Sequence, residues 1–118
     1  MDNNHKHLET VFGLTGKVAV VTGGGGVLLG TISRALGRAG AKVAILDLDL
    51  EAAQKVENQI VSGGGEAIAV KCNVLDEANL KHACRTVVER FNRLDFLING
   101  AGGNKKEATT VQIFLSSS

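Results

Sequence analysis

The chain has 118 residues, enough for one domain at most. Its charges nearly balance, with 13 Lys and Arg against 12 Asp and Glu, so no strong field draws it to nucleic acid or to a membrane surface. Its uncharged apolar runs are too short to span a bilayer, and its first ten residues lack the apolar core of a secretory signal. With only two cysteines and no such signal, the expected location is the reducing cytoplasm. Neither nucleic acid nor a membrane is expected as a partner.

Short apolar runs rich in β-branched residues predict four strands in chain order. They cover residues 17–23, 42–47, 66–72 and 94–98, and a helical pattern separates each from the next. This alternation with short connections predicts an α/β fold with a parallel, doubly wound sheet in the strand order 3-2-1-4. That is the N-terminal half of a Rossmann-like sheet, whose switch point lies between the first and fourth strands.

Three amphipathic helices are predicted between the strands. The first follows a glycine cluster and ends at Gly40, the second covers about residues 51–61 after an expected cap at Asp49, and the third begins at the cap Asp76. The apolar residues expected to face the sheet are Ile32, Ala35, Leu36 and Ala39 in the first helix, Ala53, Val56 and Ile60 in the second, and Leu80, Cys84, Val87, Val88 and Phe91 in the third.

The pattern predicts one partial domain over residues 1–118, with its core at 14–104 and no predicted element at 105–118. Four strands alone leave the fourth at an open edge, which favours self-association. The apolar patch "VQIFL" either folds back over this edge or has no structural role. Both alternatives stay open at this point.

The stretch "VVTGGGGVLLGT", residues 20–31, places four consecutive glycines between the first strand and the first helix. Either they form only a tight turn, or bare backbone there approaches a phosphate at the helix N-terminus. A P-loop is not formed, because Thr31 and Ile32 stand where Lys and Ser or Thr belong. The GxGxxG dinucleotide motif also fails, because Leu28 or Leu29 replaces its third glycine.

Asp47 ends the second strand, 24 residues after Gly23. An acid at this place can accept hydrogen bonds from an adenosine ribose. It also repels a 2′-phosphate, by roughly 4 kcal/mol at about 4 Å and an effective dielectric constant of about 20. NAD is therefore the expected cofactor, in preference to NADP. The alternative is that Asp47 only starts a turn or caps the next helix.

Several motifs together resemble one family. The segments "GKVAVVTG", "RALGRAGAKVAILD", "GGEAIAVKCNVLDE" and "RLDFLINGAGG" make residues 17–102 similar to the N-terminal half of the short-chain dehydrogenase/reductase family. Its signature TGxxxGxG is matched at Thr22 and Gly23, but Val27 and Leu29 replace the later glycines. Val27 does not easily adopt a positive φ, so Gly24, Gly25 and Gly26 are expected to move the flexible point upstream, with Gly30 serving helix packing. The glycine clusters look most like a subgroup that oxidises sugar acids of the D-mannonate or fructuronate type.

The resemblance implies a set of cofactor-binding positions. The Asn-Asn-Ala-Gly motif of the family appears as "NGAG", in which Asn99 is expected to steady the sheet. Asn73 and Val74 stand at an Asp-Val position whose side chain contacts adenine. The cofactor-binding residues implied are Thr22, Gly23, Gly25, Gly26, Val27, Leu28, Asp47, Leu48, Asn73, Val74, Asn99, Gly100, Ala101 and Gly102.

No catalytic or metal-binding residue is predicted. In this family a Tyr-x-x-x-Lys pair with a serine carries hydride transfer, and the chain has no tyrosine. The histidines, cysteines, tail serines and loop lysines all have simpler interpretations as surface or core residues. They are His5, His7, His82, Cys72, Cys84, Lys105, Lys106 and Ser116 to Ser118.

The leading hypothesis is the NAD-binding portion of an oxidoreductase of this family, inactive in hydride transfer by itself. It would represent a fragment, a truncated product or an incompletely covered chain. The alternative is a non-catalytic interaction module that pairs through its open sheet edge.

Overall fold

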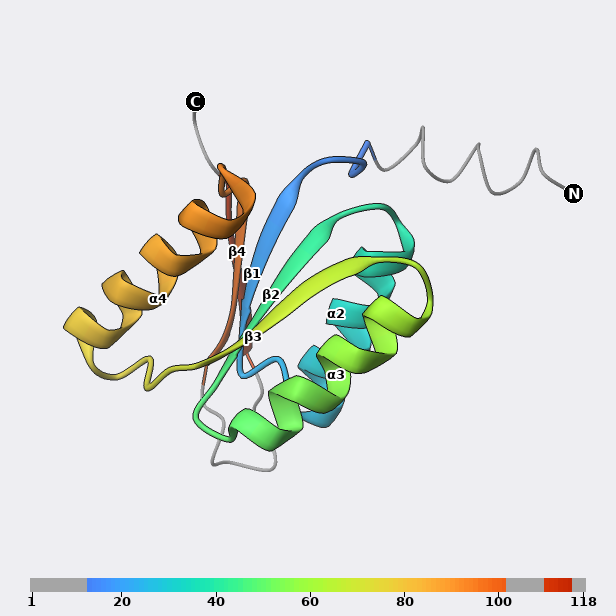
Figure 1. Cartoon of the computed structure of the whole chain (residues 1–118). Helices are drawn as coiled ribbons and strands as arrows, with labels where there is room; N and C mark the ends of the chain where they lie inside the picture. The colour runs from blue at the N-terminus through green and yellow to red at the C-terminus, as the bar shows by residue number, and fades with distance from the viewer. Residues whose placement is uncertain (1–12, 102–109, 116–118) are drawn as a thin grey trace, which may run out of the picture.

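The computed structural model describes residues 13–101 and 110–115 (Figure 1). Strands and helices alternate from β1 to β4, as the sequence predicts, and a fifth strand follows. The elements are β1 (Val18–Thr22), α2 (Val27–Arg38), β2 (Lys42–Asp47), α3 (Leu50–Ser62), β3 (Glu66–Lys71), α4 (Glu77–Phe91), β4 (Phe96–Ala101) and β5 (Thr110–Leu115).

The five strands form one sheet in the order β3-β2-β1-β4-β5. The first four strands are parallel, so the predicted order 3-2-1-4 is confirmed. β5 was not predicted as a strand. It pairs antiparallel with β4, and Ile98 lies opposite Ile113. The patch at 111–115 therefore folds back along β4, which is the first of the two alternatives that the sequence left open.

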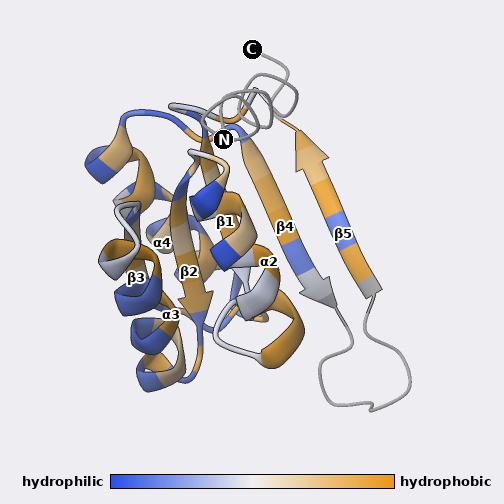
Figure 2. Cartoon of the chain, turned by 90° about the vertical axis from the view of Figure 1, so that its right-hand side faces the viewer, coloured by the Kyte–Doolittle hydropathy of each residue, from blue (hydrophilic) through white to orange (hydrophobic). Residues whose placement is uncertain are grey.

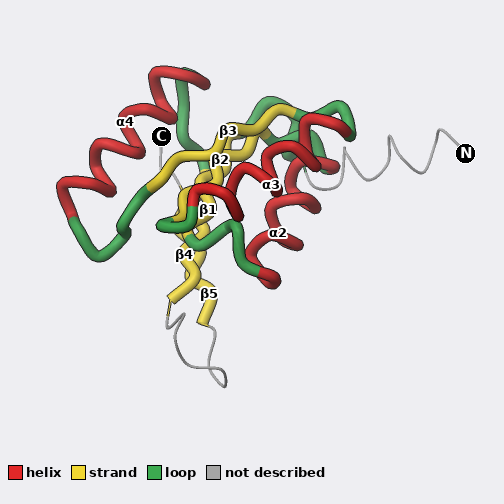
Figure 3. The backbone as a smooth tube through the Cα atoms, turned by 60° about the horizontal axis from the view of Figure 1, so that its bottom comes forward, coloured by secondary structure: helices red, strands yellow, loops and turns green. Residues whose placement is uncertain are grey.

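Helices cover both faces of the parallel strands. Helices α2 and α3 lie on one face and α4 on the other, and Figure 3 shows the sheet between these layers. Because β1 and β2 are central, their side chains are buried on both faces: Val21 and Ile45 pack under α2 and α3, whereas Val20 and Leu46 pack under α4. Burial on both faces explains why the apolar runs in these strands are continuous rather than alternating with polar residues.

Two of the three predicted helix stripes need correction. In α2, Ala35 is exposed, and the buried residues are Leu29, Gly30 and Ser33. Ile32 and Leu36 do pack against the core, partly buried, as predicted. The most buried side of α2 lies next to them because α2 packs against α3 as well as the sheet, and a Cβ on Gly30 would lie 3.4 Å from Val56 Cγ2.

In α4, Val88 is 43% exposed and the buried stripe is Ala83, Val87 and Phe91. No second described helix lies on the face that α4 covers, so nothing shields the flank that carries Val88. The predicted stripe of α3 is confirmed, since Ala53, Val56 and Ile60 are its buried residues.

The edge formed by β4 and β5 extends beyond the helices. Figure 2 shows both strands largely in the apolar colour, with β5 standing clear of α2. Ile113, Phe114 and Leu115 are 62%, 53% and 69% exposed. Residues of β5 thus remain exposed on both faces, whereas β4 is flanked by β1 and β5. None of the described helices is both long and apolar enough to span a membrane.

Candidate functional site

The predicted site residues gather at the carboxyl ends of the strands. Thr22 ends β1, Asp47 ends β2, Asn73 follows β3, and Asn99 lies near the end of β4. These four strands are neighbours in the sheet, and the topological switch point, where the strand order reverses, lies between β1 and β4. The backbone of Ala101 also belongs to β4, and Gly102 lies outside the described residues.

The first two glycines of the turn are needed by the protein's own structure. Gly23 has a φ of 68°, the left-handed conformation that glycine adopts without strain. Gly24 is buried, and a Cβ there would lie 2.7 Å from Ile45 Cγ2. The positive φ of the turn therefore lies at Gly23, the glycine that matches the family signature, and not at Gly24, Gly25 or Gly26 as expected from the sequence.

The last two glycines differ from each other. A Cβ on Gly25 would lie 2.7 Å from the Cβ of Ala52 and 2.8 Å from the amide nitrogen of Ala53, so the turn rests directly on the first turn of α3. At Gly26 a Cβ would approach only the Gly23 carbonyl oxygen, at 3.4 Å. Crowding therefore explains Gly25, and it does not explain Gly26.

Gly26 is the N-cap of α2 and supplies no side-chain cap. Within the described part of the chain, the amides of Val27 and Leu28 have no hydrogen-bond acceptor, as expected in the first turn of a helix that lacks a cap. Val27 is 91% exposed and Leu28 48%. The positive end of the α2 dipole is therefore open at the carboxyl edge of the sheet, where an anion would be stabilised.

The other two helices begin with an aspartate cap, as predicted. Asp49 Oδ1 accepts a hydrogen bond from the Ala52 amide at 3.2 Å, and Asp76 Oδ1 accepts one from the Asn79 amide at 3.2 Å. These side chains satisfy donors that remain open in α2.

Asp47 joins the glycine turn to the end of β2. Its Oδ2 accepts a hydrogen bond from the Gly25 amide at 3.0 Å, and its Oδ1 accepts one from the Asp49 amide at 2.9 Å. Asp49 is the helix cap, so Asp47 does not cap α3 but does take part in the turn before it. Leu48, the next residue, is 63% exposed.

Hydrogen bonds between side chains join the ends of β1, β4 and β5. The Thr22 hydroxyl donates to Asn99 Oδ1 and accepts from the Gly100 amide at 3.2 Å. Asn99 Nδ2 donates to Gln112 Oε1 at 3.4 Å. Thr22 is 2% exposed, so this contact holds two central strands together in the interior. Gln112 was missed because the sequence predicts no strand around it.

Asn73 is held in a local turn after β3. Its Oδ1 accepts from the Leu75 amide at 3.0 Å, and its own amide donates to Asn79 Oδ1 at 2.7 Å. Val74 is half-buried against the α4 side of the core, and Leu75 is 93% exposed. Sequence reasoning missed Asn79, which fixes the backbone on which Asn73 stands.

The two cysteines contribute no reactive group. Burial raises the pKa of the Cys72 thiol, and the nearby Cys84 and Asp76 raise it further. Burial also raises the pKa of Cys84, which is half-buried rather than buried as its predicted place in the stripe required. Both thiols therefore stay protonated near neutral pH.

No cluster of three or more His, Cys, Asp or Glu suited to a metal ion occurs among residues 13–101 and 110–115. His82 is exposed on α4, as predicted. Several polar residues singled out in the sequence lie outside the described residues: His5, His7, Lys105, Lys106 and Ser116 to Ser118.

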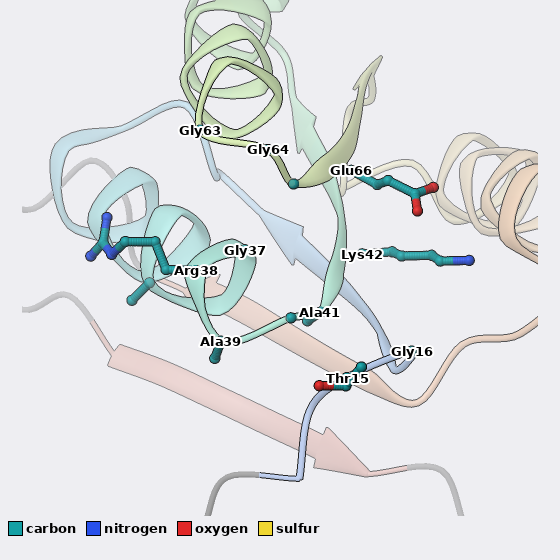
Figure 4. A pocket seen from close by; sticks show the side chains of 13 residues that line it. Thr15, Gly16, Gly37, Arg38, Ala39, Ala41, Lys42, Gly63, Gly64 and Glu66 are labelled. Atoms are coloured by element: carbon teal, nitrogen blue, oxygen red, sulfur yellow. The ribbon is translucent and has the colours of Figure 1, made fainter. Parts of the chain in front are cut away.

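A hollow of 890 Å³ lies at the opposite end of the sheet, beside the amino ends of the strands (Figure 4). Its walls include the ends of α2 and α3, with Arg38, Gly63 and Gly64 among the lining residues. Carbonyl groups and the negative ends of two helix dipoles lie here, which disfavours a phosphate. The hollow is therefore a poorer anion site than the turn before α2.

The sequence of residues 17–114 matches the family model described as short chain dehydrogenase. The chain belongs to this family. An uncharacterised oxidoreductase, UxuB, of Bacillus subtilis (strain 168) is 47% identical over 97 residues, which are 82% of this chain and 35% of the relative. The chain thus spans about a third of the length of the curated short-chain dehydrogenases that it matches.

Solved structures of short-chain dehydrogenases share the fold. A putative D-mannonate oxidoreductase from Haemophilus influenzae with bound NAD has a TM-score of 0.75 and 42% identity, covering 89% of this chain and 38% of that one. A metagenomic short-chain oxidoreductase in complex with NADP has a TM-score of 0.68 and 36% identity, covering 71% and 38%. Structural neighbours in this family therefore bind either nicotinamide dinucleotide.

Proposed function

We propose that this chain is the NAD-binding part of a short-chain dehydrogenase. The observation that carries the proposal is the open N-terminus of α2, which lies at the switch point of the sheet beside the carboxylate of Asp47. A pyrophosphate is the group that suits two unpartnered amides at the positive end of a helix. The amides of Val27 and Leu28 are proposed to receive it, and Gly26 leaves room for it.

The remaining predicted residues are proposed to hold the two nucleoside halves. Leu48 and Val74 would contact adenine from the ends of β2 and β3, with Asn73 beside them. The exposed side chain of Leu48 supports this role, because a flat apolar base would shield it from water. Thr22, Gly23 and Gly25 shape the turn, and the backbone from Asn99 to Gly102 would lie along the second ribose.

Asp47 is proposed to select NAD. Its oxygens lie at the end of β2, where they can accept hydrogen bonds from ribose hydroxyls, and their negative charge disfavours a 2′-phosphate. Because family neighbours use either dinucleotide, this selection rests on the residue itself and not on the fold.

The bound dinucleotide would supply hydride transfer with a hydroxy or keto substrate. A sugar acid is the proposed substrate class, because the chain is 42% identical to a putative D-mannonate oxidoreductase. The catalytic tyrosine of the family is absent from these 118 residues, so we propose that the chain by itself binds the dinucleotide and does not turn over substrate. The protonated thiols of Cys72 and Cys84 suit a reducing cytoplasm.

Calorimetric titration of the purified chain with NAD, and then with NADP, tests the proposal. We expect heat with NAD, weaker binding of NADP, and, in an absorbance assay, neither oxidation of D-mannonate with NAD nor reduction of fructuronate with NADH. A folded sample that binds neither nucleotide would refute the binding proposal. Turnover of a sugar acid would refute the proposed inactivity.

A second candidate is self-association through β5. The observation in its favour is the exposure of Ile113, Phe114 and Leu115 on an uncharged edge strand. Sedimentation velocity over a range of concentrations separates the candidates, because an interaction module forms a dimer without binding NAD. A monomer that binds NAD excludes this candidate.

A further inference from the structure

The glycine turn is attached to the end of β2 by its own backbone amides. The Gly23 amide donates to the Leu46 carbonyl oxygen at 2.7 Å, and the Gly24 amide approaches the same oxygen at 3.4 Å. The Gly25 amide donates to Asp47 Oδ2 at 3.0 Å. Consecutive amides of the turn are thus directed at two consecutive residues of β2.

The contact at Asp47 is the one that involves a side chain, and it joins two loops. Residues 25 and 47 are 22 positions apart in sequence, and the other carboxylate oxygen is held by the Asp49 amide at 2.9 Å. The Gly25 backbone also lies against Ala52, where even a methyl group would not fit. The carboxylate therefore bridges the turn before α2 and the turn before α3.

We propose that Asp47 is a positioning residue for the glycine turn as well as the group that selects NAD. This inference rests on the proposed function and deepens it. The carboxylate holds Gly25 so that the following amides, those of Val27 and Leu28, face the place of the pyrophosphate. Nucleotide selection and placement of the pyrophosphate loop then depend on one side chain.

The two roles predict different behaviour of Asp47→Ala. If Asp47 only repels the 2′-phosphate, the variant loses NAD affinity and gains NADP affinity. If it also positions the turn, both nucleotides lose the same part of their pyrophosphate contact, because the amides that receive it are no longer held in place, so the gain in NADP affinity is smaller than the relief of repulsion alone would give. We expect the positioning loss to be about tenfold, the effect of losing one charge-assisted hydrogen bond, so Asp47→Asn, which removes the charge but keeps an acceptor oxygen for the Gly25 amide, should bind NADP up to about tenfold more tightly than Asp47→Ala.

Amide hydrogen exchange of the ligand-free protein gives a readout that does not depend on nucleotide binding. We expect Asp47→Ala to accelerate exchange at Gly25 by about tenfold or more, since the amide loses its acceptor. Asp49→Ala is the matched control. It removes a carboxylate two residues away and the cap of α3, but leaves the Gly25 acceptor in place, so exchange at Gly25 stays unchanged.

A measurement on the unaltered chain guards against a variant that fails to fold. Scalar coupling across the hydrogen bond, between the Gly25 amide nitrogen and the Asp47 carboxyl carbon, is expected. Unchanged Gly25 exchange in a folded Asp47→Ala protein, absence of the coupling, or equal NADP binding by Asp47→Ala and Asp47→Asn would overturn the positioning role. Failure of the unaltered chain to bind NAD, with the coupling present, would instead refute the proposed function and leave the contact intact.

Discussion

The first backbone amides of α3 and α4 are capped by a side chain, whereas those of α2 are not. Asp49 and Asp76 each place a carboxylate oxygen on an amide of the following helix, whereas Gly26 places nothing on α2. A cap of this kind is worth about 1 kcal/mol to a helix. The helix without one is the helix that begins at the switch point of the sheet. The difference indicates that α3 and α4 have their first amides satisfied by their own capping aspartates and that α2 leaves room for an anion.

The largest expected effect is on stability and is expected at Gly25, whose backbone packs against the first turn of α3. Gly25→Ala would place a methyl group 2.7 Å from the Ala52 Cβ and 2.8 Å from backbone, which cannot give way easily. We expect the free energy of unfolding to fall by about 2 kcal/mol, as for other overpacked sites, in urea denaturation. Gly26→Ala is the control and should lose only about 0.5 kcal/mol, because its methyl group is unobstructed. Equal losses would show that the turn does not rest on α3.

Giving α2 the cap that the other helices have is expected to separate stability from binding. Gly26 has φ −74° and ψ 173°, an extended conformation that suits an aspartate cap. Gly26→Asp should raise the free energy of unfolding by about 0.5 kcal/mol and weaken NAD binding by about tenfold or more, because the new charge occupies the place of the pyrophosphate. The tests are urea denaturation and calorimetric titration.

Gly26→Asn is the matched variant for this comparison. It caps the helix without a charge, so it should keep most of the gain in stability and lose less NAD affinity. NAD affinity that survives the aspartate unchanged would count against a pyrophosphate at this helix.

Removing a cap from α4 is expected to affect stability alone. Asp76→Ala leaves the Asn79 amide without its acceptor and should lower the free energy of unfolding by about 1 kcal/mol. Asp76→Asn keeps an acceptor oxygen and should recover most of this loss. Chemical denaturation measures both variants, and a nucleotide titration should show no change in either. A loss of NAD affinity in Asp76→Ala would contradict the claim that the cap of α4 contributes to stability and not to nucleotide binding.

The smallest expected effect lies at the far end of β1, at Asp95. Its Oδ2 accepts a hydrogen bond from the Val18 amide at 2.8 Å, and Arg93 donates to both carboxylate oxygens. The hydrogen bond from Arg93, assisted by that from Val18, holds the pKa of Asp95 below its ordinary value of 3.8, although burial opposes the shift.

A lowered pKa in the folded protein favours the charged carboxylate. Its contribution to stability is therefore complete above the ordinary pKa and is lost as the pH falls through the lower, folded value. We expect the difference in urea midpoint between the unaltered chain and Asp95→Asn to shrink below about pH 4. The loss should be smaller than that of a helix cap, since Arg93 is half-exposed. A difference that grows on acidification would contradict the sign of this shift.

Sequence reasoning predicted the elements whose cause is local. The central strand β1 is buried at every position because it is covered on both faces, and its apolar run was recognised for that reason. Asp49 and Asp76 each predicted the start of the helix that follows. The glycine clusters and Asp47 were singled out because they follow the carboxyl ends of predicted strands, whereas the remaining site residues, such as Asn73 and Asn99, were implied by the resemblance to the family. The predictions that failed depend on tertiary packing: Ala35 is exposed because α2 packs against α3 as well as the sheet, and Val88 is exposed because no second described helix lies beside α4.

Three contacts at the site had no sequence signature. Gly25 is required by the closeness of Ala52, and Gln112 reaches Asn99 only because β5 returns along β4. The Gly-Gly-Asn stretch at 102–104 is a turn signal, but five residues separate it from β5, so the spacing does not predict a tight hairpin. The contact between Asp47 and Gly25 depends likewise on how two loops meet, although each residue was singled out by sequence.

The antiparallel return of β5 has a consequence for how the sheet assembles. β4 and β5 are joined by one short connection, so their pairing closes a small loop, whereas β1 meets β4 only after three strands and three helices of intervening chain. Small loops close earlier and at a lower entropic penalty. The hairpin can thus be in place before the parallel core is complete, and β4 then docks beside β1 with one side already occupied.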